Sequence, residues 1–295
     1  PEPGLAELMR TLRGRFTATG DYASAIRETD CTFIIVPTPS LRDGTFSDEY
    51  VCNALWQLSL SLRQSRKPYH LFVITSTVSP GTTEGKLVPL IEQSSGRKLN
   101  EGFGVCYSPE FIALGTVIRD FLNPDMVLIG ESDDAAGKIL AGIYRKLCDN
   151  QPAVCRMSIV SAEVAKISLN SYVTMKISFA NTLAAVCEAI PGADIDAITR
   201  ALGADRRIGP AYLRGGASYG GPCFPRDNRA FAAFATKCGA VSPLARATDE
   251  VNDAHIAHIT GKVRQAVADP RSLVAVLGVA YKPGTVVIEE SAGVK

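Results

Sequence analysis

A cysteine and an aspartate lie four residues apart in a segment rich in glycine and proline. Cys223 and Asp227 belong to the stretch GGASYGGPCFPRD, and the glycines and prolines around the cysteine suit a tight loop over a ligand. Asp227 lies near the start of a predicted helix, where a carboxylate is favourable. A loop cysteine close to a helix N-terminus tends to be reactive. The pattern favours a nucleophilic cysteine, and a buried, unreactive loop cysteine is the alternative.

Two polar residues lie one turn apart on a long, mostly apolar predicted helix. Lys166 and Asn170 stand at positions i and i+4 in AEVAKISLN, so their side chains project from one face. An ammonium and an amide among apolar residues cost free energy unless they are paired or used. The spacing therefore indicates either functional groups or an ordinary solvated face. Glu110 follows the end of a predicted strand in YSPEF, which by itself is a weak functional signal.

The composition is that of a globular chain without an extended charged surface. The 295 residues are 46% hydrophobic, and 31 basic against 30 acidic residues give a net charge of +1. This balance disfavours nucleic-acid and membrane-surface partners. None of the eight cysteines forms a CxxC pair, so we expect no metal site and a reduced, cytoplasmic protein. Charged and amide residues interrupt the most apolar helix, 158–190, so we expect no membrane span.

The first part of the chain alternates short β-rich runs with helical patterns. The predicted strands are 31–37, 71–77, 103–109 and 125–131, and the predicted helices are 48–62, 81–93 and 133–148. This alternation predicts an α/β domain over residues 1–157, with a Rossmann-like parallel sheet covered by helices. Ligands bind at the carboxyl ends of such strands, where the chain reads VPTPS and TSTVSPGTT. We expect Trp56 to lie in the core.

The second part of the chain is mostly helical. Its predicted helices are 158–190, 194–202, 227–237 and 245–267. They predict a helical central domain over residues 158–268, with His255 and His258 on a solvated helix face. The final apolar run, SLVAVLGVAYKPGT, predicts a strand that opens a second α/β domain over residues 269–295. We expect the chain to be a piece of a longer protein.

Ordered motifs along the whole chain resemble the UDP-glucose/GDP-mannose dehydrogenase family. The motifs are VPTP, STVSPGTT, SPEF, AEVAKISLNSYVTMKISFAN, GGASYGGPCFPRD and GVAYKPGT. The resemblance implies an NAD-dependent, four-electron oxidation of a nucleotide sugar to its uronic acid. It also implies an NAD-binding Rossmann domain, a central helical domain that forms a homodimer, and a C-terminal domain that binds the nucleotide.

The resemblance implies a role for each matching residue. Cys223 would form a thiohemiacetal and then a thioester, while Lys166 and Asn170 would stabilise the oxyanion. Glu110 would be the general base for thioester hydrolysis, and Asp227 would position a water molecule. The other implied contacts are with the cofactor (Thr38, Pro39, Ser76 and Thr77), with the catalytic water (Thr77), and with the substrate (Glu110, Phe111, Lys166, Asn170, Tyr212, Gly216, Gly220 and Lys282).

Departures from the family pattern leave alternatives open. The family's GxGxxG fingerprint does not occur in the 295 residues, so the Rossmann-like domain is expected to be partial. Leu114 and Glu289 stand where many members have a glutamate and an arginine. The sugar stays open between a UDP-hexose and a UDP-N-acetylhexosamine, with a GDP-sugar less favoured. A non-catalytic fragment or pseudoenzyme that keeps the dimer core is one alternative function, and a two-electron β-hydroxyacid dehydrogenase, which has no use for Cys223, is another.

Overall fold

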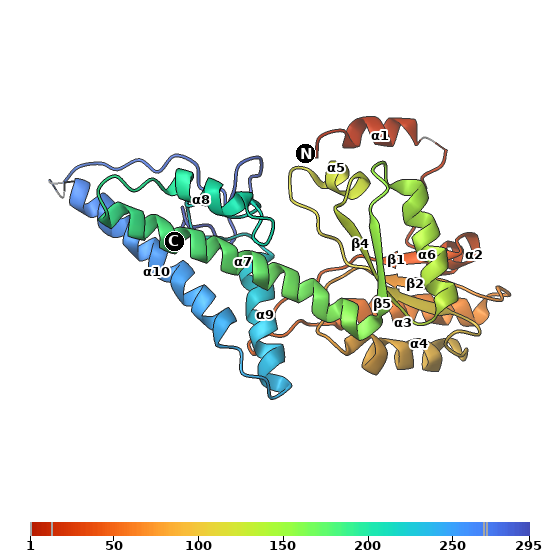
Figure 1. Ribbon diagram of the computed structural model, residues 1–295. Coiled ribbons are helices and arrows are strands. Elements are labelled where there is room, and N and C mark those ends of the chain that lie inside the picture. Colours follow the sequence, from red (N-terminus) through yellow and green to blue (C-terminus); the bar gives the residue numbers. More distant parts are fainter. Residues whose placement is uncertain (1, 13, 268, 270) are drawn as a thin grey trace. The chain divides into compact units, whose positions relative to one another are not determined.

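The computed structural model describes residues 2–12, 14–267, 269 and 271–295, which form two compact units (Figure 1). The first, here the sheet unit, spans Pro1–Lys166, and the second, the helical unit, spans Ile167–Lys295. The boundary falls inside one long helix, α7 (Ile159–Ala189). The predicted change of domain after residue 157 lies close to the start of this helix.

The sheet unit is built on five strands in the order β1–β2–β3–β4–β5. Their bounds are β1 (Cys31–Ile34), β2 (Leu71–Ile74), β3 (Gly104–Tyr107), β4 (Met126–Glu131) and β5 (Ala153–Ser158). The predicted α/β class is confirmed, but the sheet is not wholly parallel, because β3 and β4 pair antiparallel. A parallel pair needs a crossover connection that returns the chain to the start of the next strand. The connection from β3 to β4 contains only the six-residue helix α5 and does not make that return.

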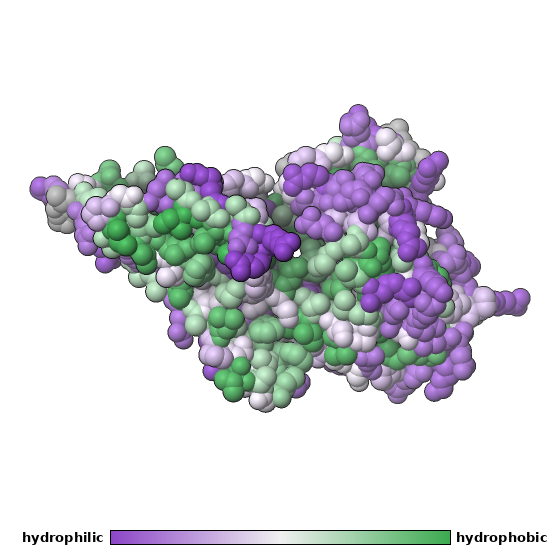
Figure 2. Space-filling view, in the orientation of Figure 1, coloured by the Kyte–Doolittle hydropathy of each residue, from purple (hydrophilic) through white to green (hydrophobic). Residues whose placement is uncertain are grey.

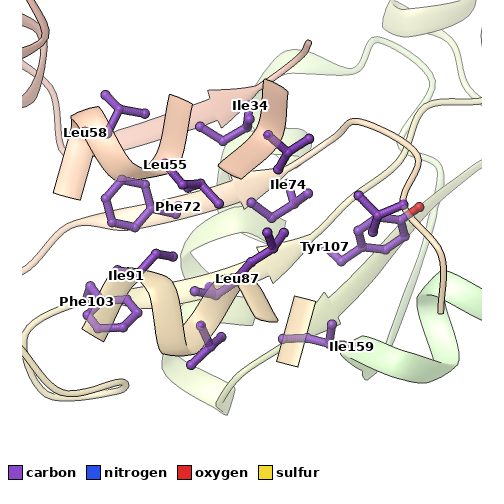
Figure 3. Close-up of a cluster of buried hydrophobic side chains, with 14 of the residues drawn as sticks. Ile34, Leu55, Leu58, Phe72, Ile74, Leu87, Ile91, Phe103, Tyr107 and Ile159 are labelled. Carbon is purple, nitrogen blue, oxygen red and sulfur yellow. The ribbon is translucent and has the colours of Figure 1, made fainter. Parts of the chain in front are cut away.

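Helices cover both faces of the sheet. The helices of the sheet unit are α1 (Leu5–Thr11), α2 (Tyr22–Glu28), α3 (Glu49–Gln64), the π-helix η1 (Thr83–Leu87), α4 (Val88–Ser95), α5 (Val117–Leu122) and α6 (Asp134–Leu147). Side chains alternate between the two faces of a strand. On β2, Phe72 and Ile74 pack with α3, α4 and the first turn of α7 (Figure 3), whereas Leu71 and Val73 pack against α6. Burial on both faces explains why the strands are continuously apolar.

Several elements differ from the sequence prediction. The patterns did not predict α1, α2, α5 or β5, which are short or carry polar residues within them. Trp56 was expected in the core, but it is 44% exposed. The buried face of its helix, α3, is filled instead by Val51, Leu55, Leu58 and Leu62.

The helical unit contains most of α7 and three further helices. These are α8 (Ile195–Ala204), α9 (Phe224–Lys237) and α10 (Pro243–Ala266). The strand predicted over 272–285 is wrong, since the described residues from 271 onward form no strand. An extended segment becomes a strand only when a neighbour takes up its N–H and C=O groups. No strand of the described chain pairs with this segment, and the assignment of 269–295 to a further domain stays a prediction.

Candidate active site

A row of buried polar side chains runs along α7 at spacings of three and four residues. Its members, which we call the polar row, are Glu163, Lys166, Asn170, Thr174, Ser178 and Asn181. Such spacing places side chains on one face of a helix. The row extends the Lys166 and Asn170 pair found in the sequence. Their interpretation as a solvated face is wrong, because Lys166 is 7% and Asn170 6% exposed.

In the sheet unit, Lys166 lies beside the segment that follows β3. Its Nζ donates to the backbone oxygen of Glu110 at 2.8 Å and lies 4.6 Å from the centroid of the Phe111 ring. Burial raises the pKa of the Glu110 carboxyl, and the Lys166 ammonium opposes that rise. A carboxylate with a raised pKa is a stronger base than an ordinary one. The structure thus brings together three of the predicted residues, Glu110, Phe111 and Lys166.

The predicted cofactor contacts lie at the carboxyl ends of β1 and β2. Thr38 and Ser76 are buried, Thr77 is half-buried and Pro39 is exposed. The Ser76 hydroxyl accepts from the N–H of Val36 at 2.8 Å and lies 2.8 Å from the oxygen of the same residue. Ser76 therefore ties the two strand ends together. The polar side chains gather at the edge where parallel sheets bind ligands.

A buried carboxylate that the sequence patterns did not predict shapes the turn after β2. Glu163 is 0% exposed, and it accepts from the N–H groups of Gly81 at 2.6 Å and Thr83 at 3.0 Å. Gly81 has a φ of 87°, which favours glycine. Burial raises the pKa of Glu163, although its hydrogen bonds act in the opposite direction. The signal available in the sequence was an acid three residues before Lys166.

In the helical unit, a fully buried carboxylate links the polar row to the loop cysteine. Asp227 accepts from Asn170 Nδ2 at 2.6 Å and from Arg226 Nε at 3.0 Å. Its own N–H donates to the oxygen of Cys223 at 2.8 Å, because Cys223 is the N-cap of α9. The thiol is exposed, so the alternative of a buried loop cysteine is wrong. The N-terminal end of a helix carries partial positive charge, which favours an anionic sulfur.

The C-terminal segment lies against the glycines that precede Cys223. Gly221 has a φ of 82°, and a Cβ at this position would lie 2.6 Å from the ring of Tyr281. The N–H of Gly221 donates to the oxygen of Glu289 at 2.9 Å. Burial and the nearby Cys223 raise the pKa of Tyr281, whose ring centroid is 5.9 Å from Lys282 Nζ. The segment brings Lys282 to the cysteine loop together with Tyr281, a residue that the sequence analysis did not select.

The remaining predicted substrate contacts are Tyr212, Gly216 and Gly220, which lie in the segment before α9. Tyr212 is 53% exposed, and its ring meets that of Phe224 edge-on at 6.0 Å between centroids. Gly216 is exposed and Gly220 is buried within the glycine-rich loop. The predicted site residues therefore form one group in each unit.

The two helical histidines are engaged in hydrogen bonds. Nε2 of His255 lies 2.7 Å from the oxygen of Gly216, and Nε2 of His258 lies 2.7 Å from the Glu188 carboxylate. Within the described ranges, no group of three or more His, Cys, Asp or Glu side chains could hold a metal ion. No helix in that part of the chain is long and apolar enough to cross a membrane.

Two family models match the chain. The NAD binding domain of the UDP-glucose/GDP-mannose dehydrogenase family matches residues 1–148, and the central domain of the same family matches residues 160–254. The two matches together cover most of the sheet unit and the part of the helical unit that extends into α10.

Similar proteins cover nearly the whole chain. A UDP-glucose 6-dehydrogenase, AglM, from Haloferax volcanii is 38% identical over 98% of this chain and 67% of its own length. A GDP-mannose 6-dehydrogenase from Pseudomonas putida is 33% identical over 98% of this chain and 65% of its own. The structure of a UDP-glucose dehydrogenase from Pyrobaculum islandicum matches with a TM-score of 0.90 and 34% identity, over 100% of this chain and 67% of that one. The chain spans about two thirds of the length of these relatives.

Proposed function

The chain belongs to the UDP-glucose/GDP-mannose dehydrogenase family, and from that membership we propose that it oxidises the C6 alcohol of a nucleotide sugar to a carboxylic acid with NAD. The observation that carries the proposal is the placement of Cys223 at the N-terminus of α9, one turn before the buried Asp227 that holds Asn170. A two-electron dehydrogenase does not need such a thiol.

The ends of β1 and β2 fit an NAD site. They are parallel neighbours that end at one edge of the sheet, which is where dinucleotides bind in this type of fold. The hydroxyl groups of Thr38 and Thr77 suit the polar groups of a dinucleotide. Thr38, Pro39, Ser76 and Thr77 would hold the cofactor, which when bound accepts hydride.

Cys223 supplies the nucleophile that permits two oxidations at one carbon. The C6 alcohol first loses a hydride and a proton and becomes an aldehyde. The Cys223 sulfur adds to this carbonyl, so that a C–S bond forms and a thiohemiacetal holds the intermediate on the protein. Loss of a second hydride and proton gives a thioester, and water then breaks the C–S bond to release the acid and the thiol. Each sugar loses two hydrides, so the reaction consumes two molecules of NAD.

Lys166 and Asn170 stabilise the negative charge that develops on the C6 oxygen in these steps. They carry an ammonium and an amide N–H, which are the donors that an oxyanion needs. Asp227 holds the Asn170 amide at 2.6 Å and so determines its orientation. Removal of one such donor lowers the rate by roughly 100-fold or more.

Glu110 activates the water that hydrolyses the thioester. Burial raises its pKa, which makes the carboxylate a stronger base than an ordinary glutamate. The Lys166 ammonium opposes this rise and so favours the ionised carboxylate. We propose a UDP-hexose or a UDP-N-acetylhexosamine as the substrate. A GDP-sugar is the second choice, because several relatives are named GDP-mannose 6-dehydrogenase.

We further propose a homodimer formed through α7. Tyr172, Phe179 and Val186 are spaced by seven residues and are 57%, 52% and 48% exposed. They form an apolar stripe along one side of the helix, and Figure 2 shows hydrophobic side chains gathered on the helical unit.

Phe179→Glu is expected to give a monomer by light scattering. Val241→Glu, a change at a residue that is 91% exposed, is the control, and a monomeric parent protein would contradict the proposal.

The proposed reaction is tested by its stoichiometry. The purified protein is incubated with NAD and a panel of UDP- and GDP-sugars, and the NADH formed per sugar consumed is measured. We expect two NADH per sugar for the substrate, and loss of this product in Cys223→Ser. Cys238→Ser is a matched control, because Cys238 is also exposed and lies at the opposite end of the same helix.

The outcomes separate the alternatives. One NADH per sugar with full activity in Cys223→Ser would contradict the thioester route. No NADH from any sugar would contradict the proposed enzyme and favour a non-catalytic protein that keeps the helical core.

A further inference from the structure

Two buried asparagine side chains hold the loop that precedes Cys223. Asn181 lies at the end of the polar row on α7, and Asn252 lies on α10. They are 1% and 4% exposed. The proposed mechanism gives neither residue a role, yet a buried amide is costly unless its donors and acceptor are satisfied.

Both amides bond to the backbone of the loop. Asn181 Oδ1 accepts from the N–H of Gly216 at 2.9 Å, and its Nδ2 donates to the oxygen of Ala217 at 3.4 Å. Asn252 Oδ1 accepts from the N–H of Tyr219 at 2.8 Å, and its Nδ2 donates to the oxygen of the same residue at 3.1 Å. Each side chain thus satisfies one donor and one acceptor of the loop, as a neighbouring strand would do.

Further contacts from α10 reach the same loop. Ser218 Oγ donates to the backbone oxygen of Asn252 at 2.7 Å, and Nε2 of His255 lies 2.7 Å from the oxygen of Gly216. The hydroxyl of Tyr219 donates to Asp249. A glycine-rich segment loses much conformational entropy when it is ordered, so an ordered loop needs contacts of this kind.

We propose that Asn181 and Asn252 are positioning residues, which hold the backbone of residues 216–219 in its substrate-binding conformation before the nucleotide sugar arrives. The identity of the ligand rests on the function proposed above. The two asparagines act through the loop, because their amides bond to its backbone. A loop that is already ordered lowers the entropic cost of binding.

The same contacts determine which backbone N–H groups of the loop are already hydrogen-bonded within the protein. The N–H groups of Gly216, Tyr219 and Gly221 are used within the protein. No hydrogen bond in the described part of the chain uses the remaining loop N–H groups, which belong to Ala217, Ser218 and Gly220. Of these three residues Ala217 is exposed, whereas Ser218 and Gly220 are buried, so we expect the N–H of Ala217 to be the one that meets a nucleotide sugar.

The test measures hydrogen exchange of the loop in the ligand-free chain. Asn181→Asp and Asn252→Asp keep the size of the side chain and its accepting oxygen, but they lack the N–H donor and place a carboxylate against a backbone oxygen. We expect exchange of the amide that each asparagine binds to become roughly 10- to 100-fold faster, which is Gly216 in the Asn181 variant and Tyr219 in the Asn252 variant. Asn181→Ala and Asn252→Ala add no charge and make the same test if an aspartate prevents folding.

A matched control separates positioning from general loss of stability. Asn228 is also a fully buried asparagine of the helical unit, and its side chain bonds to Ser171 and Ala245 but not to the loop. Asn228→Asp is expected to leave exchange in 216–219 unchanged. Equal acceleration in this control would overturn the proposal, as would unchanged exchange in the Asn181 and Asn252 variants.

A second measurement links the loop to its ligand. The Kd of UDP-glucose, or of the sugar found active in the panel, is measured by calorimetry, and we expect a rise of about tenfold or more in the Asn181 and Asn252 variants. The kcat at saturation is expected to change less than the KM. Faster exchange with unchanged affinity would overturn the positioning role. A parent protein that forms no NADH, but whose loop order depends on both asparagines, would overturn the proposed function alone.

Discussion

The sheet unit and the helical unit differ in the proportion of apolar to polar side chains that they bury, which is higher in the sheet unit. In the sheet unit, the strands and covering helices form two apolar clusters on the two faces of the sheet. In the helical unit, buried polar side chains of α7 bond to other segments: Asn170 to Asp227, Ser178 to the oxygen of Thr248, and Asn181 to the loop. Apolar packing is non-directional, whereas hydrogen bonds hold groups in one orientation. We infer from this difference that buried hydrogen bonds of the helical unit hold the candidate site residues in a fixed orientation.

Cysteine illustrates the same difference. Cys31 and Cys106 lie on strands of the sheet unit, and burial raises their pKa values to about 11 and about 12. They behave as small hydrophobic side chains. Cys223 is exposed at a helix N-terminus, a position that favours an anionic sulfur.

The largest expected effect would show that a residue of the sheet unit also takes part in the reaction. Glu110→Gln is expected to slow thioester hydrolysis by roughly 100-fold or more, because the variant cannot accept a proton. Since burial raises the pKa of Glu110, the parent rate should fall as the pH drops through a range above that of an ordinary glutamate. Single-turnover kinetics at several pH values measure both effects. A Glu110→Gln variant with the parent rate and pH profile would remove Glu110 from the mechanism.

Truncation of a buried apolar side chain is expected to destabilise the sheet unit. Leu55 is 0% exposed on α3, and Leu55→Ala should lower the free energy of unfolding by about 2–5 kcal/mol, through lost burial and a cavity. Trp56→Ala is the control on the same helix, because Trp56 is 44% exposed, and it should cost much less. Urea unfolding followed by circular dichroism measures both, and equal losses would contradict the assigned core.

A buried histidine makes the sheet unit sensitive to acid. His70 is 0% exposed, and burial lowers its pKa from 6.5 to about 4. The unfolded chain therefore binds a proton more readily between these values, so stability is full above pH 6.5 and falls as the pH drops toward 4. The loss is up to about 3 kcal/mol. His70→Gln should flatten this dependence in urea unfolding. A parent protein equally stable at both pH values would contradict this burial effect.

The smallest effect gives the sharpest comparison, because the same substitution is made in a helix of each unit. Ser178 of α7 donates to the oxygen of Thr248 at 2.9 Å, so Ser178→Ala should cost about 1 kcal/mol of unfolding free energy. Ser59 of α3 is buried and its hydroxyl has no partner in the described chain. Ser59→Ala should be neutral or stabilising, since it removes an unsatisfied group. Equal effects of the two changes would remove the distinction between the units.

The sequence predicted much of the local structure. The strands β1 to β4, the helices α3 and α6, and the long helices α7 and α10 follow from periodicity that adjacent residues carry. The spacing of Lys166 and Asn170 places them on one helix face in any fold that keeps the helix. The mixed sheet direction and the absence of a strand over 272–285 did not follow, because pairing depends on residues far along the chain.

The sequence by itself determined the α/β class of the first unit, the cysteine at a helix start and the set of residues shared with the dehydrogenase family. Only the tertiary structure decided which buried polar groups meet. Asn181 and Asn252 are 71 positions apart, and no local pattern connects them, yet both bond to the loop before Cys223. A hydrogen bond forms only when two groups come within reach in the folded chain, so these partners become visible only after the helices have packed.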